Sequence, residues 1–137
     1  PDQLDAALRT YREMFSTEAP TAQIDRPRVM AGINVMVADT DEEARRQFTV
    51  VEQMFLDLKH NLRRKIQPPV DPDTLAAQGG GNEPMLRIKA VGSPPTVKAQ
   101  LDEFVARTGA DELITVTYAH DPAVRDRSLE LLAKAWF

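Results

Sequence analysis

The sequence has no cysteine, and it contains only two histidines and one tryptophan in 137 residues. Without cysteine the chain has no disulfide, no thiolate nucleophile and no cysteine zinc site, and it fits a reducing compartment. His60 and His120 lie far apart in the sequence with no metal-ligand spacing between them. We therefore expect a cytoplasmic protein without a metal site.

The chain also lacks long apolar runs and an excess of charge of one sign. No apolar stretch reaches the roughly 18 residues that a membrane-spanning helix needs. The 17 basic and 21 acidic residues are interspersed and leave a net charge of -4, so no basic stripe offers a surface to nucleic acid. We expect neither a membrane nor a nucleic acid as a partner.

The length is that of one ordinary globular domain. The chain opens PDQLDAALRTYREMF, which lacks the charged and then apolar regions of a secretory signal. Because it begins with Pro1 and runs directly into a helical pattern, we expect a piece of a longer protein.

Two helices and a strand are predicted in the first half. Apolar side chains at helical spacing predict a helix over residues 2–15 and a long helix from Asp41 to about Lys65. Thr40-Asp41-Glu42-Glu43 is a capping box at the start of the long helix. Strict alternation over residues 28–38 predicts a strand with one apolar face, whereas Gly32 and Asn34 on the other face suit a barrel interior or a close approach by a ligand.

Residues 66–84 contain three prolines followed by a run of glycines, and they predict a long irregular loop or linker. Leu86 to Val91 then gives only a weak signal for a short strand.

The stretch from Val91 to Pro122 predicts an α/β unit. Ser93 is placed to cap a helix that starts with two prolines and ends at Gly109. Residues 112–118 are apolar or β-branched on both faces, which predicts a strand covered on both sides. Asp121-Pro122 begins a last helix that carries Val124, Ser128, Leu131 and Ala135 on one face.

Strands separated by helices predict an α/β fold with parallel pairing. Two firm strands cannot form a well-covered sheet, so either residues 86–91 supply a third strand or strands come from elsewhere.

Two segments closely resemble the C-terminal part of luciferase-like flavin-dependent monooxygenases, the bacterial luciferase superfamily. They are VMAGINVMVADTDEEARRQF and AVGSPPTVKAQLDEFVARTGADELITVTYAHDPAVRDRSLELLAKA. The order and spacing of ADTDEEAR, the GSP helix start and TGADELITVT carry the resemblance. One departure is GGGN, where the family has a longer and often helical segment.

The resemblance implies the C-terminal portion of a (β/α)8 barrel, with residues 28–38 and 112–118 as its last two strands. Such barrels typically need about 250 residues, so most of the barrel is absent. It also implies that reduced flavin mononucleotide (FMN), or the deazaflavin F420 in some branches, oxidises a small organic substrate with O2. Because the family's catalytic histidine and many flavin contacts lie in earlier strands, we expect no tight cofactor binding by this segment alone, and the catalytic residues stay unknown.

Three residues are candidates for cofactor contacts. Tyr118 and His120 follow the carboxyl end of a strand, where barrel enzymes place their sites, and Asn34 lies on the mixed face of the first strand. Each has a purely structural alternative. Tyr118 is then an aromatic side chain packed at the end of the strand, His120 a loop or capping residue, and Asn34 an interior amide bonded to neighbouring side chains.

Two rival interpretations stay open. The chain is an assembly module that pairs with the rest of a barrel or with a second copy through exposed strand edges, which predicts a homo-oligomer. Alternatively, it is a small βαβαβα domain in which residues 86–91 form the central strand.

Overall fold

The computed structural model describes residues 2–137. Within this range the chain alternates helices and strands, as expected for an α/β protein. The elements are α1 (Asp2–Met14), β1 (Met30–Val37), α2 (Asp41–Lys59), α3 (Pro72–Ala77), the 3-10 helix η1 (Pro84–Leu86), β2 (Lys89–Gly92), α4 (Pro94–Thr108), β3 (Glu112–Val116) and α5 (Pro122–Trp136).

The three strands form one parallel sheet in the order β2-β1-β3. The two firmly predicted strands are neighbours, since Met30 to Asn34 of β1 pairs with Glu112 to Val116 of β3. The weakly predicted strand also exists, as β2, and it pairs with the second half of β1. The interpretation that made it the central strand is wrong, because β1 is central and β2 is an edge strand.

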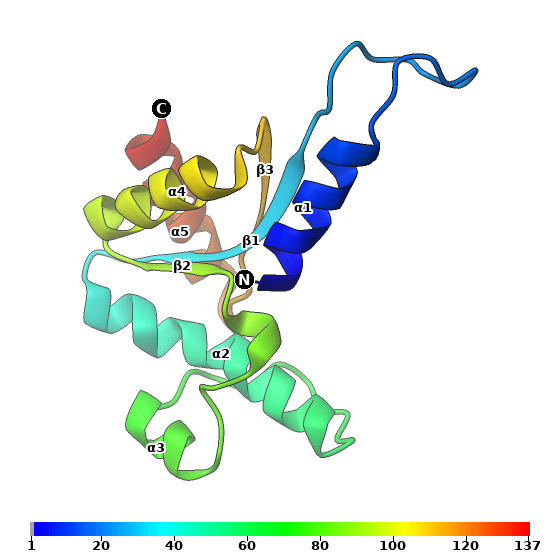
Figure 1. Ribbon diagram of the computed structural model, residues 1–137. Coiled ribbons are helices and arrows are strands. Elements are labelled where there is room, and N and C mark those ends of the chain that lie inside the picture. The colour runs from blue at the N-terminus through cyan, green and yellow to red at the C-terminus, as the bar shows by residue number, and fades with distance from the viewer. Residues whose placement is uncertain (1) are drawn as a thin grey trace.

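Helices pack on both sides of the sheet (Figure 1), with α4 and α5 on one side and α2 on the other, and α3 lies against α2. This follows from the strand order, because the right-handed connection from β1 to β2 and the connection from β2 across β1 to β3 run in opposite directions along the sheet. Alternate residues of β1 build a core with α4 and α5, and Leu4 and Leu8 of α1 border it. The buried members are Val29, Ala31, Ile33, Val35, Val37, Ala90, Val97, Leu101, Phe104 and Leu131.

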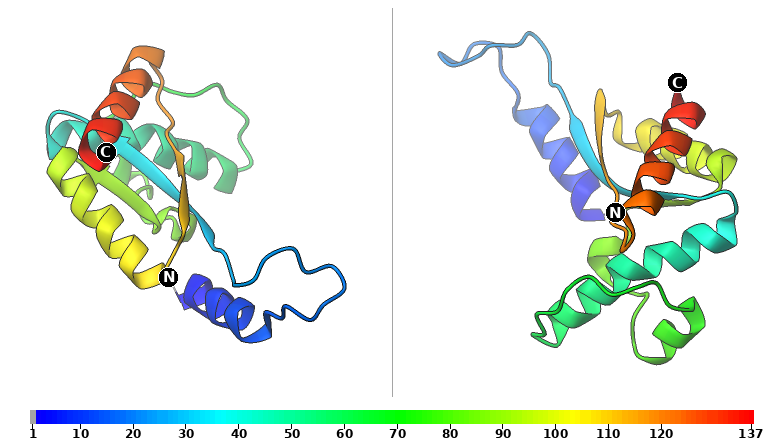
Figure 2. Two further views of the ribbon diagram at one scale, coloured as in Figure 1. Left: turned by 90° about the horizontal axis from the view of Figure 1, so that it is seen from above. Right: turned by 180° about the vertical axis from the view of Figure 1, so that it is seen from behind.

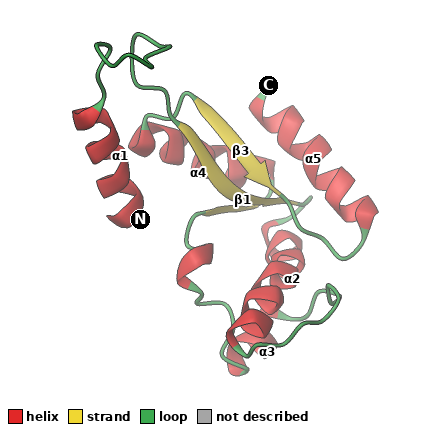
Figure 3. Ribbon diagram, turned by 90° about the vertical axis from the view of Figure 1, so that its right-hand side faces the viewer, coloured by secondary structure: helices red, strands yellow, loops and turns green. Residues whose placement is uncertain are grey.

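The opposite face of the sheet is covered only near the carboxyl ends of the strands. There α2 buries Met36 and Ala38 against Phe48 and Val51. Further back the face is open, with Met30 58%, Ile114 50% and Val116 37% exposed. The prediction that residues 112–118 are covered on both sides is therefore wrong, and Figure 3 shows β1 and β3 side by side along this part of the sheet.

Helix α2 starts as predicted and ends early. The N–H of Glu43 donates to Thr40 Oγ1 at 3.2 Å, but the Glu43 carboxylate accepts from Arg46 and Gln47 rather than from the cap. The helix stops at Lys59 and not near Lys65, because Asn61 turns into the left-handed region with φ 55°.

Residues 66–84 are irregular except for α3, and they are fastened to α2. Thr49 Oγ1 accepts the N–H of Val70 at 3.0 Å and donates to the carbonyl of Arg46 at 2.7 Å. Leu75 of α3 is buried. By contrast, residues 16–25 extend away from the body of the molecule, as Figure 2 shows from two sides.

Within residues 2–137, none of the helices combines the length and the apolar character needed to cross a membrane.

Gly92 ends β2 where the start of α4 meets the start of α2. A Cβ at this position would lie 2.6 Å from Thr96 Cγ2 and 2.8 Å from Asp41 Oδ1, whereas a Cβ at Gly32 on the open face would have no neighbour within 4 Å. The close approach of two helix starts thus requires glycine at 92 but not at 32.

We expect Gly92→Ala to lower the free energy of unfolding by about 1–3 kcal/mol, since either Thr96 or the Asp41 contact must move. Gly32→Ala, the matched control, should change it by less than about 0.5 kcal/mol. Urea unfolding of both variants measures the difference. Equal stability of the two variants would contradict the close approach.

Candidate functional site

All three strands point their carboxyl ends to the same edge of the sheet, and a helix begins after each one. This is the edge at which α/β proteins bind ligands. The connections place Asp39, Ser93 and Asp121 there, directly before α2, α4 and α5. The Asp121 cap is formed as predicted, since its carboxylate accepts the N–H of Ala123 at 2.9 Å.

A carboxylate from α2 holds the start of α4. Asp41 Oδ1 accepts the N–H of Ser93 at 2.6 Å, and this bond, followed by bonds to the Ser93 and Thr96 hydroxyls, lowers the pKa of Asp41. Ser93 itself does not cap α4 as predicted, because its hydroxyl pairs with Thr96 Oγ1 at 3.1 Å. The polar groups of Asp41, Ser93 and Thr96 at this corner of the sheet edge therefore bond to one another.

The start of α5 is tied to the end of β1. The N–H of Val37 donates to Ser128 Oγ at 2.9 Å, and both residues are buried. Beside this bond Arg127 pairs with Asp39 at 2.9 Å. A cavity of about 280 Å³ lies between the starts of α2 and α5, lined by Val37, Ala38, Asp39, Glu43, Gln47, Ala123, Val124 and Arg127.

One of the three candidate residues lies on the sheet. Asn34 is opposite Val116 in the register, and Tyr118 follows two residues later, beyond the end of β3. Asn34 is half-buried, and its Nδ2 is 3.5 Å from the carbonyl of Ile88, at the limit of a hydrogen bond. Tyr118 is 42% exposed.

His120 lies further along the same connection between β3 and α5, and it is exposed. Thr117, the first residue after β3, carries a buried hydroxyl that has no hydrogen-bond partner within residues 2–137. Thr117, Tyr118 and His120 thus follow the carboxyl end of β3, and Asn34 lies opposite the last residue of that strand.

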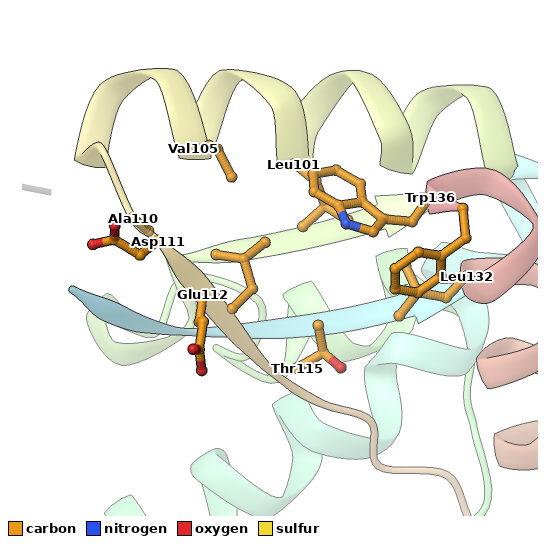
Figure 4. A pocket seen from close by; sticks show the side chains of 10 residues that line it. Leu101, Val105, Ala110, Asp111, Glu112, Thr115, Leu132 and Trp136 are labelled. Carbon is orange, nitrogen blue, oxygen red and sulfur yellow. The ribbon is translucent and has the colours of Figure 1, made fainter. Parts of the chain in front are cut away.

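A larger groove lies away from this edge (Figure 4), between α4, β3 and α5. Its volume is about 490 Å³, and its walls are mainly apolar. The lining residues are Leu101, Val105, Ala110, Asp111, Glu112, Leu113, Thr115, Leu132, Trp136 and Phe137. None of the predicted site residues lines this groove.

A second opening of about 490 Å³ lies beside β2 and is lined by Arg45, Arg87 and Lys89 among others. Lys89 is already engaged there, because its Nζ is 3.3 Å from Glu52 Oε1 and 4.8 Å from the centre of the Phe48 ring. In the described part of the chain, no three His, Cys, Asp or Glu side chains are grouped to hold a metal ion.

Comparison with known families decides the relationship. The family model described as luciferase-like monooxygenase matches residues 1–112. The chain belongs to the luciferase-like monooxygenase family. Among curated proteins, YvbT of Bacillus subtilis (strain 168) is 37% identical over 134 residues, which are 95% of this chain and 39% of YvbT.

Two solved structures have a similar fold. Apo-MsnO8 is 31% identical and superposes with a TM-score of 0.75 over 97% of this chain and 41% of its own. The oxygenating constituent of 3,6-diketocamphane monooxygenase from Pseudomonas putida, solved with FMN, shares the fold at 23% identity, with a TM-score of 0.52 over 95% of this chain and 39% of its own.

This luciferase-like chain spans about two-fifths of the length of the relatives it matches. Its small parallel sheet agrees with the expected portion of a (β/α)8 barrel.

The sequence reasoning missed the bonds that join the strand ends. Neither the Asp41–Ser93 bond nor the Ser128–Val37 bond has a local pattern, because their partners lie 52 and 91 residues apart. A signal was present for Ser128, which is a polar residue in the apolar stripe of its helix.

Removing the Ser128 hydroxyl should leave the buried N–H of Val37 without a partner. We expect Ser128→Ala to lower the free energy of unfolding by about 1–3 kcal/mol. The control Arg127→Ala removes a neighbouring exposed ion pair and should cost much less. Thermal and urea unfolding test this, and an unchanged Ser128→Ala variant would contradict the assigned role.

Asp41 makes the stability of the chain depend on pH. Its pKa in the folded state lies below the usual 3.8, so its contribution is present above pH 3.8 and is lost as the pH falls through the folded-state pKa. The variant Asp41→Asn should therefore be less stable than wild type near neutrality, and this difference should shrink in acid. Glu42→Gln, at an exposed neighbour, is the control. A difference between wild type and Asp41→Asn that is constant across this pH range would refute the linkage.

Proposed function

We propose that this chain is a segment of a flavin-dependent monooxygenase that oxidises a small organic substrate with reduced flavin and O2. The observation that carries the proposal is the family match over residues 1–112. A structural neighbour solved with FMN supports a flavin in this family. Bound reduced flavin would supply the two electrons that, with two protons, convert one oxygen atom of O2 to water while the other enters the substrate.

The residues at and just after the carboxyl end of β3, with Asn34 opposite them on β1, have side chains of the kinds that bind a flavin. Val116 offers an apolar surface, Asn34 offers an amide whose present bond to Ile88 is long, and Tyr118 offers an exposed ring and hydroxyl. A flavin ring has an apolar plane and a polar edge, and such ligands are held by apolar walls with a few placed polar groups. His120, exposed in the connection after β3, offers an imidazole that can donate a hydrogen bond to a phosphate.

The chain alone supplies only one side of such a pocket. Met30, Ile114 and Val116 face outward without cover, so the remaining walls must come from other polypeptide. We therefore expect no tight FMN binding by residues 1–137 in isolation, and F420 remains the alternative cofactor.

The test is a chimera in which this chain replaces the matching 39% of YvbT. We expect the folded chimera to quench FMN fluorescence on binding, and Tyr118→Ala and Asn34→Ala each to weaken binding about tenfold or more. Met30→Ala, on the same face but at the other end of β1, should leave the affinity unchanged.

The outcomes separate the claims. A folded chimera that binds no FMN would refute FMN as the cofactor, and the chimera would then be titrated with F420. A chimera that binds FMN equally well with and without Tyr118 and Asn34 would remove those residues from the site while retaining the cofactor.

A second function, an assembly module without catalysis of its own, is favoured by one observation. Ile114 and Val116 of β3 are 50% and 37% exposed.

A further inference from the structure

β2 lies between α4 and α2 (Figure 1), and its outer edge is closed by a side chain of this chain. The N–H of Val91 donates to Gln100 Oε1 at 2.8 Å, and Gln100 Nε2 donates back to the carbonyl of Val91 at 3.4 Å. Gln100 thus takes the place that a neighbouring strand would occupy. The surface beside β2 is therefore bounded by groups of the chain itself, and its hydrogen bonds require no further strand at Val91.

The opening of about 490 Å³ beside β2 has an apolar floor. Phe48 of α2 is only 4% exposed, and Val91 packs against the same buried cluster. Pro72, at the start of α3, belongs to the same lining. A preformed opening of this volume is large enough for a small organic ligand.

Three basic side chains line the opening, and they come from different elements. Arg45 lies in the first part of α2, Arg87 between η1 and β2, and Lys89 in β2. The acidic residue in the same lining is Glu52, which is buried. Three positive charges face one negative charge, so the opening carries an excess of two positive charges.

Lys89 is held in place and neutralises the buried carboxylate. Its Nζ is 3.3 Å from Glu52 Oε1 and 4.8 Å from the centre of the Phe48 ring. The cation therefore has an acidic partner on one side and an aromatic face on the other. The excess positive charge is left to the two arginines.

Arg45 and Arg87 are both exposed, and within residues 2–137 neither guanidinium has a hydrogen bond or an ion pair. Asp41 lies one helical turn before Arg45, but its carboxylate accepts the N–H of Ser93 instead. Two guanidinium groups with unused donors thus border one preformed opening.

This arrangement suits a phosphate group that carries an organic substituent. A guanidinium donates paired hydrogen bonds to phosphate oxygens, and a phosphate monoester carries about 1.5–2 negative charges at neutral pH, which matches the excess charge. Phosphate alone would leave the floor formed by Phe48 and Val91 uncovered. An organic group on the ester would cover it.

We propose that the opening between α2, β2 and α4 binds the phosphate monoester of a small organic compound, with Arg45 and Arg87 donating to the phosphate. The organic group lies over the apolar floor. None of Asn34, Tyr118 and His120 lines this opening. The proposal therefore does not require the flavin assignment, and a failure of one leaves the other standing.

Calorimetric titration of the 137-residue chain with phenyl phosphate tests the site, at about pH 8, where the ester is a dianion. We expect a Kd of about 0.1–1 mM. Arg45→Gln and Arg87→Gln should each weaken binding about fivefold or more, because each removes charge-assisted hydrogen bonds. Circular dichroism checks that both variants are folded. The matched control is Arg63→Gln, which removes the same charge from an exposed position outside the opening and should change the Kd less than about twofold.

Inorganic phosphate is the second probe. It should bind about fivefold more weakly than phenyl phosphate, since it buries none of the apolar floor. Equal affinity for the two probes would overturn the assignment of an organic ester. A folded wild-type chain that binds no phenyl phosphate at about 10 mM, or equal weakening in the Arg63→Gln control, would overturn the site itself.

Discussion

The structure depends on β1 being hydrogen-bonded on both edges. Backbone groups of alternate residues serve β2 and β3 in turn, as the bond from Asn34 N–H to Ile88 on one side and the bond from Glu112 N–H to Val29 on the other illustrate. The same strand supplies the apolar residues that α4 and α5 cover, and its carboxyl end is fixed to α5 by Ser128. Every buried cluster of the described chain includes residues from β1.

The sheet built on β1 is finished on one side and open on the other. The face under α4 and α5 is packed, and the ends of the strands are joined to the helices by the hydrogen bonds of Asp41 and Ser128. The opposite face leaves Met30, Ile114 and Val116 exposed near Asn34 and Tyr118. The cover that α2 gives to this face is confined to the carboxyl end of β1, and a half-covered sheet is consistent with a chain that spans about two-fifths of its relatives.

Local sequence signals were enough to predict most of the helices and strands. The Thr40 cap, Asp121-Pro122 and Gly109 with φ 58° fixed helix ends within a few residues of the prediction. The predictions that were wrong concern features that depend on residues far apart in the sequence. The end of α2 depends on the turn at Asn61, the open face of β3 depends on which helices reach it, and the order β2-β1-β3 depends on the direction of each crossover. Strand direction alone predicted that the candidate residues lie toward the carboxyl ends of the strands, whereas the bonds that join these ends connect residues far apart in sequence.

The most direct test of this account is amide hydrogen exchange of the 137-residue chain, read residue by residue. If β1 is paired on both edges, the amides of Ala31 and of Ile33 to Val37 exchange most slowly, with Asn34 and Val37 as protected as their neighbours. Exchange of these amides as fast as that of residues 16–25, which lie outside any helix or strand, would show that the central strand does not form, and the account would be contradicted.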